Sequence, residues 1–307
     1  MEQQRSIDQL YEQRIKFPDP DYLERYNALV GIDKAKARLT KLLHFMLAPD
    51  DLRSWGKRTY PDASSIINTV LARPPLIIIS GDVGTGKTEL ATTIGAYVSR
   101  LSKKSISLFP LSLSARGEGR VGEMTQLISD AFALMYDESR RLSKSNGSAS
   151  GGNILLIDEA DALAQSRETS QMHHEDRAGV NALIRGIDRL SDTRCPAAVI
   201  MSTNRLSAID PAIQRRAAEV FVFNRPNFEQ RLRVLSELKC FGFDVTQIER
   251  LAKVGEGDDI TFTYSDLRQR YIPSLVLEAA PDKIVEFEEA LSLLSTLRPT
   301  PSFNEEV

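Results

Sequence analysis

The chain has 307 residues, 42% hydrophobic and 26% charged, which is ordinary for a globular protein of one large domain or two modest ones. Its formal charge of −3 provides no overall attraction to nucleic acid or to an anionic membrane, although a local basic patch can hide in the total. Its two cysteines are too few for a disulfide framework, and no apolar run approaches the ~20 residues that cross a bilayer, so we expect a cytoplasmic protein without a secretory signal.

The first 28 residues are polar and charged, and they are too few to form a domain of their own. Ile7, Leu10 and Tyr11 have helical spacing, which the run Phe17-Pro18-Asp19-Pro20 interrupts. This extension either packs on the body of the protein or forms a flexible arm that contacts a partner.

A helix is expected after Leu29-Val30-Gly31-Ile32, because Asp33 is a suitable N-cap and apolar side chains recur on one face up to Met46. Residues 56–75 contain a glycine, three prolines and two serines. They therefore indicate a loop, in which residues 66–71 form a helical turn.

Residues 76–88 read LIIISGDVGTGKT, an apolar strand followed by a pattern typical of a phosphate-binding loop. Its glycines allow successive backbone N–H groups to point at one anion, and the helix that begins near Lys87 adds its positive end. Lys87 is expected at the β- and γ-phosphates and Thr88 at Mg²⁺. The chain is therefore expected to bind a nucleoside triphosphate, through Gly81, Val83, Gly84, Thr85, Gly86, Lys87 and Thr88.

Strand and helix signals alternate from there to residue 223, which predicts a parallel sheet with helices on both faces. Residues 143–152 (SKSNGSASGG) indicate a flexible surface loop. The five expected strands cover residues 76–79, 105–113, 153–157, 197–202 and 219–223. The expected helices between them cover about residues 87–101, 123–135 and 176–190, with a short one after Asp210.

Beyond Pro226 the pattern becomes helical and indicates a small second domain. Helical stripes occupy residues 232–238, 245–251, 264–279 and 281–294, with a doubtful strand at 260–262. The predicted organisation is an N-terminal extension (1–28), a large nucleotide-binding domain (29–225), a helical domain (226–297) and a tail (298–307).

Polar residues follow two of the predicted strands, and ligands of parallel sheets bind outside the carboxyl ends of the strands. Asp158 suits Mg²⁺ held through its water shell, and Glu159 can take a proton from an attacking water. The amide of Asn204 can orient that water. The Asp158-Glu159 pair alone is equally typical of a surface turn. The phosphate-binding loop, this pair and Asn204, in this order along the chain, form a set that indicates nucleotide hydrolysis.

This ordered set resembles that of the AAA+ ATPases over about residues 28–295. Residues 81–88 resemble the Walker A motif, residues 154–159 (ILLIDE) resemble Walker B, and Asn204 falls at the sensor 1 position. The helical segment after Pro226 resembles the lid domain of the family. The resemblance implies ATP and Mg²⁺ as cofactors, with Val30 and Gly31 among the nucleotide contacts. It also implies a ring, usually a hexamer, in which the neighbouring subunit completes each site.

Residues 209–216 (IDPAIQRR) resemble the segment that presents arginine fingers to the neighbouring subunit. Members of the larger AAA clade separate two arginines here by a Pro-Gly insertion, which this chain lacks. Arg216 is the preferred finger and Arg215 the second candidate, since a planar guanidinium can span two γ-phosphate oxygens. Either arginine can instead be a solvated surface charge. Arg268 is the candidate for the sensor 2 arginine of the lid.

Residues 119–123 lie where protein-unfolding AAA members carry an aromatic-Val-Gly-Glu pore loop. Arg120 replaces the aromatic residue before Val121 and Gly122, unless Leu113 or Phe109 reaches the pore. The next pore-facing loop, residues 165–176, contains His173 and His174. These histidines either contact substrate or belong to a solvated loop.

Residues 176–183 (DRAGVNAL), followed by Ile187-Asp188, resemble the pachytene-checkpoint AAA+ ATPases. Those enzymes remodel HORMA-domain proteins by pulling on an N-terminal segment, and compact bacterial relatives occur beside cGAS-like nucleotidyltransferases in anti-phage operons. The resemblance therefore implies a ring-forming ATPase with a HORMA-domain partner.

Two other functions remain open from the sequence. A nucleic-acid switch of the clamp-loader or initiator kind is opposed by the net negative charge, but Arg116 and Arg120 keep it possible. A nucleotide-gated scaffold with little turnover would not need the general base that Glu159 provides.

Overall fold

The computed structural model describes residues 10–111, 123–144, 148–163, 174–191, 195–256 and 261–302, with only the backbone at residues 123, 162 and 174–176. The chain forms two compact units, which are described separately. Unit 1 contains the described residues of Met1–Tyr26 together with Lys34–Ser80 and Thr88–Phe221. Unit 2 combines three segments that are far apart in the sequence: Asn27–Asp33, Gly81–Lys87 and the described residues from Val222 onward.

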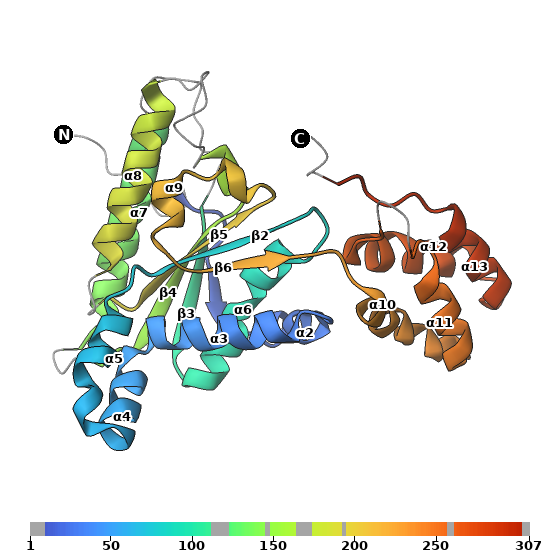
Figure 1. Ribbon diagram of the computed structural model, residues 1–307, viewed down its shortest axis with the longest axis horizontal. Coiled ribbons are helices and arrows are strands. Elements are labelled where there is room, and N and C mark those ends of the chain that lie inside the picture. Colours follow the sequence, from blue (N-terminus) through green and yellow to red (C-terminus); the bar gives the residue numbers. More distant parts are fainter. Residues whose placement is uncertain are drawn as a thin grey trace. The chain divides into compact units, whose positions relative to one another are not determined.

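A six-stranded sheet, in the order β1-β3-β4-β5-β2-β6, forms the centre of unit 1 (Figure 1). Strands β3, β4, β5 and β2 run parallel, as the sequence predicts. Each of the five predicted strands is present within a few residues of its expected position. The strands are β1 (Ile15–Phe17), β2 (Leu76–Gly81), β3 (Ser105–Pro110), β4 (Gly151–Ile157), β5 (Ala197–Thr203) and β6 (Ala217–Phe223).

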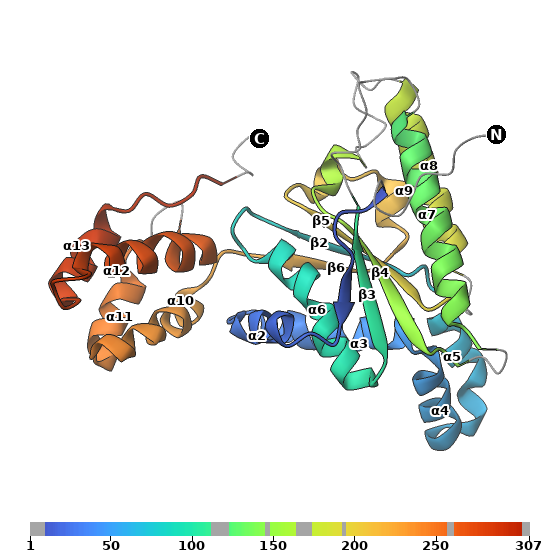
Figure 2. The ribbon, with the colours of Figure 1, turned by 180° about the vertical axis from the view of Figure 1, so that it is seen from behind.

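Helices cover both faces of the sheet (Figures 1 and 2). Leu155 and Val199 belong to the core beneath α7 (Glu123–Leu142) and α8 (His174–Leu190). The opposite face is covered by α3 (Asp33–Leu47) and α6 (Lys87–Ser102). Burial on both faces explains why the central strands read as continuous apolar runs.

The described part of the N-terminal extension packs on the body, which is one of the two alternatives left open by the sequence. Strand β1 pairs antiparallel with β3, and α2 (Pro20–Ala28) follows it. Tyr11 is buried and donates a hydrogen bond to the Ala131 carbonyl at 2.5 Å. The expected interruption at Phe17-Pro18 is the end of an edge strand, where a proline removes no ladder hydrogen bond.

The loop predicted over residues 56–75 is wrong in its first half, whereas the helical turn predicted within it at residues 66–71 is present. The chain instead forms α4 (Pro49–Thr59), a 3-10 turn at Pro61–Ala63, and α5 (Ser64–Leu71). Pro49 and Pro61 occupy the first position of their helical segments, where a proline lacks no needed N–H. Proline therefore begins structure here, although the composition indicates an interruption.

The surface loop predicted over residues 143–152 is partly wrong, because its last two residues belong to β4 and are buried. A Cβ atom on Gly152 would lie 2.8 Å from the Leu47 Cβ of α3. Glycine is used at this position because α3 approaches the sheet closely, and it does not indicate flexibility.

Helices form the described part of unit 2 after β6, in agreement with the predicted all-helical region. Phe262 lies in no strand, and residues 281–286 precede the last helix rather than belonging to it. Asn227 and Asp244 each form a capping box with the glutamine three residues later. The helices are α10 (Phe228–Leu235), η4 (Ser236–Phe241), α11 (Val245–Lys253), η5 (Asp266–Tyr271), α12 (Ile272–Ala279) and α13 (Phe287–Thr296).

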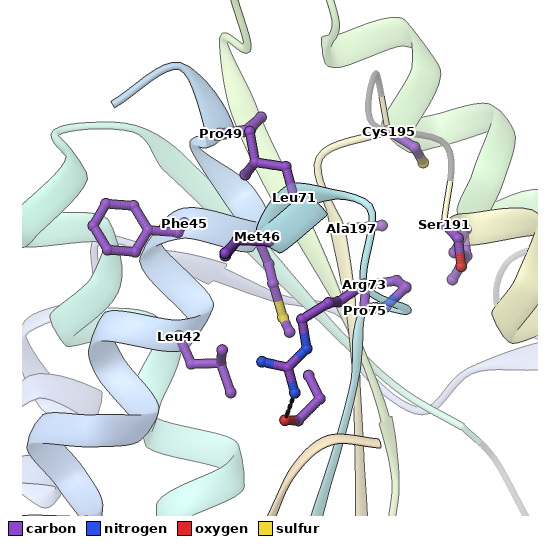
Figure 3. Close-up of a pocket in the computed structure, with 13 residues that line it drawn as sticks. Leu42, Phe45, Met46, Pro49, Leu71, Arg73, Pro75, Ser191, Cys195 and Ala197 are labelled. Atoms are coloured by element: carbon purple, nitrogen blue, oxygen red, sulfur yellow. Dashed lines mark hydrogen bonds between the residues drawn. The ribbon is translucent and has the colours of Figure 1, made fainter. Parts of the chain in front are cut away.

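A small apolar cavity of about 80 Å³ lies in unit 1, close to the amino ends of β2 and β5 (Figure 3). Arg73 donates a hydrogen bond to the Ala218 carbonyl beside it. Because the phosphate-binding sequence follows the carboxyl end of β2, this cavity is separate from the candidate nucleotide site. It is lined by Leu42, Phe45, Met46, Pro49, Val70, Leu71, Arg73, Pro75, Leu190, Ser191, Cys195, Ala197 and Ala218.

Among the described residues, no helix is both long and apolar enough to span a bilayer.

Candidate nucleotide site

Three chain segments with predicted site residues end at the same edge of the sheet in unit 1. Ser80, just before the glycine-rich loop, pairs in register with Thr203 of β5. Ile157 of β4 pairs with Met201, so Asp158 follows at the level of Ser202. The parallel register thereby brings Asp158 and Asn204, which are distant in sequence, to neighbouring strand ends.

Asp158 and Glu159 occupy the turn that follows β4. The Ser202 hydroxyl and the Glu159 backbone N–H both donate hydrogen bonds to Asp158 Oδ1. Glu159 has φ +49° and ψ +45°, a left-handed conformation that is costly for a residue with a side chain. Its carboxylate is exposed and the Asp158 side chain is half-buried, so both are accessible to a ligand.

Asn204 follows β5 in a turn that Thr203 stabilises. The Thr203 hydroxyl donates to Asp161 Oδ1 at 2.9 Å and accepts from the Arg205 backbone N–H at 3.0 Å. The half-buried Asn204 is thus presented by an ordered turn at the end of a buried strand. This rigidity suits a side chain that must hold a water molecule in one orientation.

The phosphate-binding sequence forms a tight loop in unit 2. Gly84 and Gly86 have φ angles of +74° and +90°, which residues with side chains rarely adopt. The Lys87 ammonium donates to the Asp82 carbonyl at 2.7 Å, and the Thr85 hydroxyl donates to the same oxygen at 2.8 Å. The loop leads into α6, whose first residues are Lys87 and Thr88, and the N-terminus of a helix attracts anions.

A buried ion pair inside unit 2 joins the loop to Arg225, and sequence reasoning did not find it. Arg225 donates from Nε to Asp82 Oδ2 at 2.7 Å, and the two side chains are only 12% and 9% exposed. An acidic residue inside an anion-binding loop is a signal that a cation is required nearby. The sequence does not indicate which cation, because Arg225 is 143 positions away.

Gly31 of the predicted nucleotide contacts lies against helices of unit 2. Its carbonyl accepts a hydrogen bond from Gln230 Nε2 at 2.5 Å, and the Tyr264 hydroxyl fills the space that a side chain at position 31 would need. That hydroxyl is buried without a hydrogen-bond partner among the described residues, and burial, followed by the charge of Asp33, raises the pKa of Tyr264 to about 12. The preceding contact, Val30, packs against the hydrophobic core of this unit.

Arg268, the sensor 2 candidate, contacts a different part of unit 2 from the phosphate loop. It donates to the Ala28 carbonyl at 2.7 Å and forms an ion pair with Glu237. The phosphate loop is contacted instead by Ser265, directly before η5, whose backbone N–H donates to the Gly84 carbonyl at 3.1 Å.

The two finger candidates follow α9 (Pro211–Gln214) in unit 1, and they differ in their contacts. Arg216 forms a two-pronged ion pair with Asp188 of α8, with Nε–Oδ1 at 2.7 Å and Nη2–Oδ2 at 3.0 Å. Arg215 is exposed, and within the part of the chain that the structure describes its side chain makes only a long hydrogen bond of 3.4 Å to the Pro211 carbonyl. The sequence did not predict Asp188 as the partner of Arg216.

The pore-loop predictions cannot be compared with the structure. Arg120, Val121, Gly122 and His173 lie outside the described residues, and only the backbone of His174, at the start of α8, is described.

The described residues fit a nucleotide with a divalent cation. The glycine loop supplies the phosphate cradle, and Tyr264 supplies an unpaired buried hydroxyl beside Gly31. No cluster of three or more His, Cys, Asp or Glu side chains that could hold a metal alone occurs in the described part of the chain. This agrees with the chemistry of Mg²⁺, which uses one or two protein oxygens together with substrate phosphates and water.

Comparison with known proteins identifies the family. The model of the ATPase family associated with various cellular activities (AAA) matches residues 77–225. The chain is 53% identical over 302 residues to CD-NTase-associated protein 6 of Escherichia coli strain MS 115-1, a match that covers 97% of each chain. The chain belongs to the CD-NTase-associated protein 6 family of AAA ATPases. A second family member, from Escherichia coli strain KTE188, is 35% identical over 95% of this chain and 97% of its own.

Solved structures agree with this membership of the CD-NTase-associated protein 6 family. A chain in the structure of the E. coli MS115-1 HORMA:CdnC:Trip13 complex is 52% identical, has a TM-score of 0.91, and is matched over 98% of this chain and 99% of its own. Rhizobiales Trip13 is 45% identical with a TM-score of 0.76, over 95% and 100% of the two chains. C. elegans PCH-2, at 18% identity and a TM-score of 0.61 over 92% and 72% of the chains, shows the shared fold. The predicted AAA+ fold, ATPase activity and relationship to the pachytene-checkpoint enzymes are confirmed.

Proposed function

We propose that this family member is a ring-forming ATPase that remodels or disassembles a HORMA-domain protein in an anti-phage system with a cGAS-like nucleotidyltransferase. The observation that carries the proposal is its 52% identity, over nearly the whole of both chains, to a chain in a complex with HORMA and CdnC. A hexameric ring and a cytoplasmic location belong to the proposal.

In the proposed site, each side chain either holds the nucleotide and its cation or acts on the attacking water. The loop N–H groups and Lys87 hold the triphosphate, and Thr88 and Asp158 hold Mg²⁺, which would neutralise charge on the phosphates. Glu159 takes the proton of the attacking water, and Asn204 orients that water. The exposed carboxylate of Glu159, on a strained turn beside Asp158, supports this assignment.

Completion of the site requires a neighbouring subunit in this proposal. Arg216 of that neighbour would stabilise the charge that develops on the γ-phosphate, with Arg215 as the second candidate. Hydrolysis would move the two pore loops, in which Arg120, Val121, Gly122, His173 and His174 are the proposed substrate contacts.

The test compares hydrolysis and binding in one variant. Glu159→Gln is expected to lower the ATPase rate by at least about 100-fold, because the amide cannot accept the proton, while ATP binding is retained. The control is Glu278→Gln, on the exposed side of α12, which should hydrolyse ATP at the parental rate. Parental turnover by the Glu159 variant would show that another group is the base.

The client is tested by adding possible partners to the parental protein. A purified HORMA-domain protein from a matching system should raise the ATPase rate and lose its complex with the nucleotidyltransferase in an ATP-dependent manner. Stimulation by DNA alone, with no response to the HORMA-domain protein, would overturn the proposal in favour of a nucleic-acid switch.

A further inference from the structure

The phosphate loop contains an acidic residue, Asp82, directly after its first glycine. The Asp82 side chain is 9% exposed. An unpaired carboxylate in this position would repel the phosphates of a nucleotide and would be costly to bury. The charge of Asp82 therefore has to be neutralised for the loop to act as an anion site.

Arg225 provides that neutralisation within unit 2. Its Nε and Nη2 both lie 2.7 Å from Asp82 Oδ2, and the other Asp82 oxygen accepts a hydrogen bond from the Val83 backbone N–H at 2.8 Å. The carboxylate is thus held by the arginine on one side and by the loop backbone on the other.

Arg225 also contacts the segment that precedes the helix η5–α12. Its Nη1 donates to the Thr261 carbonyl at 2.6 Å. The same segment contacts the loop through Ser265, whose backbone N–H donates to the Gly84 carbonyl. A Cβ atom on Gly84 would lie 2.7 Å from the Thr263 hydroxyl, so the segment and the loop are in close contact.

We propose that Arg225 is a positioning residue that neutralises Asp82 and connects the segment around Thr261–Ser265 to the phosphate loop. It thereby sets the affinity for a nucleoside diphosphate or triphosphate and the rate at which that ligand is released. The inference deepens the proposed function, because it rests on the same nucleotide site. One guanidinium serves both tasks: its charge makes the loop suitable for an anion, and its third nitrogen connects the loop to Thr261.

The test measures binding and release of a fluorescent ADP derivative by two variants of the full chain. Arg225→Ala removes the guanidinium that neutralises Asp82 and frees the Thr261 carbonyl, so affinity should fall about tenfold and release should accelerate, because the carboxylate then repels the phosphates. Asp82→Ala leaves the positive charge of Arg225 beside the phosphates, so affinity should rise about threefold. Alanine is preferred to asparagine, whose amide N–H would face the guanidinium donors.

The control is Arg250→Ala, also in unit 2, which removes an exposed ion pair with Glu288 at 3.8 Å. It should bind and release ADP at the parental affinity and rate. Opposite changes in the two test variants support the inference, because a pair that only stabilises the fold would weaken binding in both. Changes of the same sign, or none, overturn it. If Arg225→Ala does not fold, Asp82→Ala decides alone: tighter binding supports the inference, and any other result contradicts it.

The assay also separates this inference from the proposed function. It uses nucleotide binding only, without any HORMA-domain protein. A chain that binds ADP as expected but does not act on such a partner would contradict the proposed function and leave the role of Arg225 supported.

Discussion

At the scale of single residues, the ion pair between Arg216 and Asp188 distinguishes the two finger candidates. The Arg216 side chain is 31% exposed, and the hydrogen bond that its guanidinium donates to Asp188 raises the pKa of Arg216. Arg216 also donates to the Ala212 carbonyl at 3.0 Å, whereas Arg215 has no comparable contact among the described residues. An exposed pair of this kind contributes little to stability, so it can fix the direction of a guanidinium and still release it to a stronger anion.

Replacement of the two arginines should therefore have unequal effects. Arg216→Ala is expected to lower the ATPase kcat by about 1,000-fold, the usual contribution of an arginine finger, while ADP affinity stays at the parental value. Arg215→Ala should change kcat by less than about threefold. Steady-state kinetics and a fluorescent-nucleotide titration of both variants measure these quantities. A larger loss in Arg215→Ala would assign the finger to Arg215.

Residues whose role depends on their own sequence context are the predictable part of the site. Gly84, Lys87 and Asp158 each lie in a short motif whose residue spacing is typical of nucleotide binding. The partners of the motif residues are not predictable in this way, because Arg225 and Asp188 are brought to Asp82 and Arg216 by the fold alone. A lone arginine or aspartate in a helix or linker is, by its sequence, an ordinary surface charge.

At the scale of elements, the helix η5–α12 is fixed at its start by Asp266. The side chain of Asp266 is fully buried and accepts hydrogen bonds from the Thr263 and Thr300 backbone N–H groups at 2.9 and 3.1 Å. The Arg270 guanidinium adds a bond of 2.6 Å. Burial acts to raise the pKa of Asp266, but these hydrogen bonds outweigh burial and hold the pKa below its usual value. The carboxylate thus anchors the segment that contacts the phosphate loop.

Loss of this charge should destabilise the protein more at neutral pH than at acid pH. Asp266→Asn is expected to lower the free energy of unfolding by about 2 kcal/mol at pH 7, because buried donors lose a charged acceptor. Because the pKa of Asp266 is lower in the folded state than its unfolded value of about 4, the ionised carboxylate stabilises the folded protein above that pH. This stabilisation disappears as the pH falls through the folded-state pKa. The difference between parent and variant should therefore shrink below about pH 4. Urea unfolding at several pH values measures this difference in the free energy of unfolding.

The exposed Asp282 provides the control for this pH dependence, since Asp282→Asn should leave the unfolding free energy within about 0.5 kcal/mol of the parental value. A difference between Asp266→Asn and parent that stayed constant from neutral to acid pH would show that the hydrogen-bond geometry, rather than the charge, anchors this helix.

Elements with long periodic signals were predictable, and short or proline-flanked elements were not. The four inner strands, β3, β4, β5 and β2, have apolar runs that indicate their burial directly. In contrast, β1 has three residues and depends on pairing with β3, a long-range contact that no local pattern encodes. Helix α4 and the 3-10 turn at Pro61–Ala63 were missed because Pro49 and Pro61 are their first residues, and a proline does not reveal whether it begins or ends a helix.

At the scale of the whole molecule, the proposed site requires two copies of the chain. The base Glu159 and the finger Arg216 would act in the same site only if they come from different subunits of a ring. Asp188 holds Arg216 within its own chain. In the proposed ring, a subunit with a defective finger is expected to be complemented by a neighbour that has an intact one, whereas a monomeric enzyme cannot be complemented.

Mixing two inactive variants tests this arrangement. Glu159→Gln and Arg216→Ala should each be nearly inactive alone, for lack of a base and of a finger. In a randomly mixed ring at equal amounts, about a quarter of the interfaces combine an intact Glu159 with an intact Arg216 of the neighbour, so about a quarter of the parental ATPase rate should return. The rate of the mixture should depend on total protein concentration as the ring assembles.

A control mixture of Glu159→Gln with Lys87→Ala should show no recovery, because neither subunit then carries a complete set of its own nucleotide groups. Absence of recovery in the first mixture, under conditions in which the subunits exchange, would show that Arg216 does not act across a subunit interface.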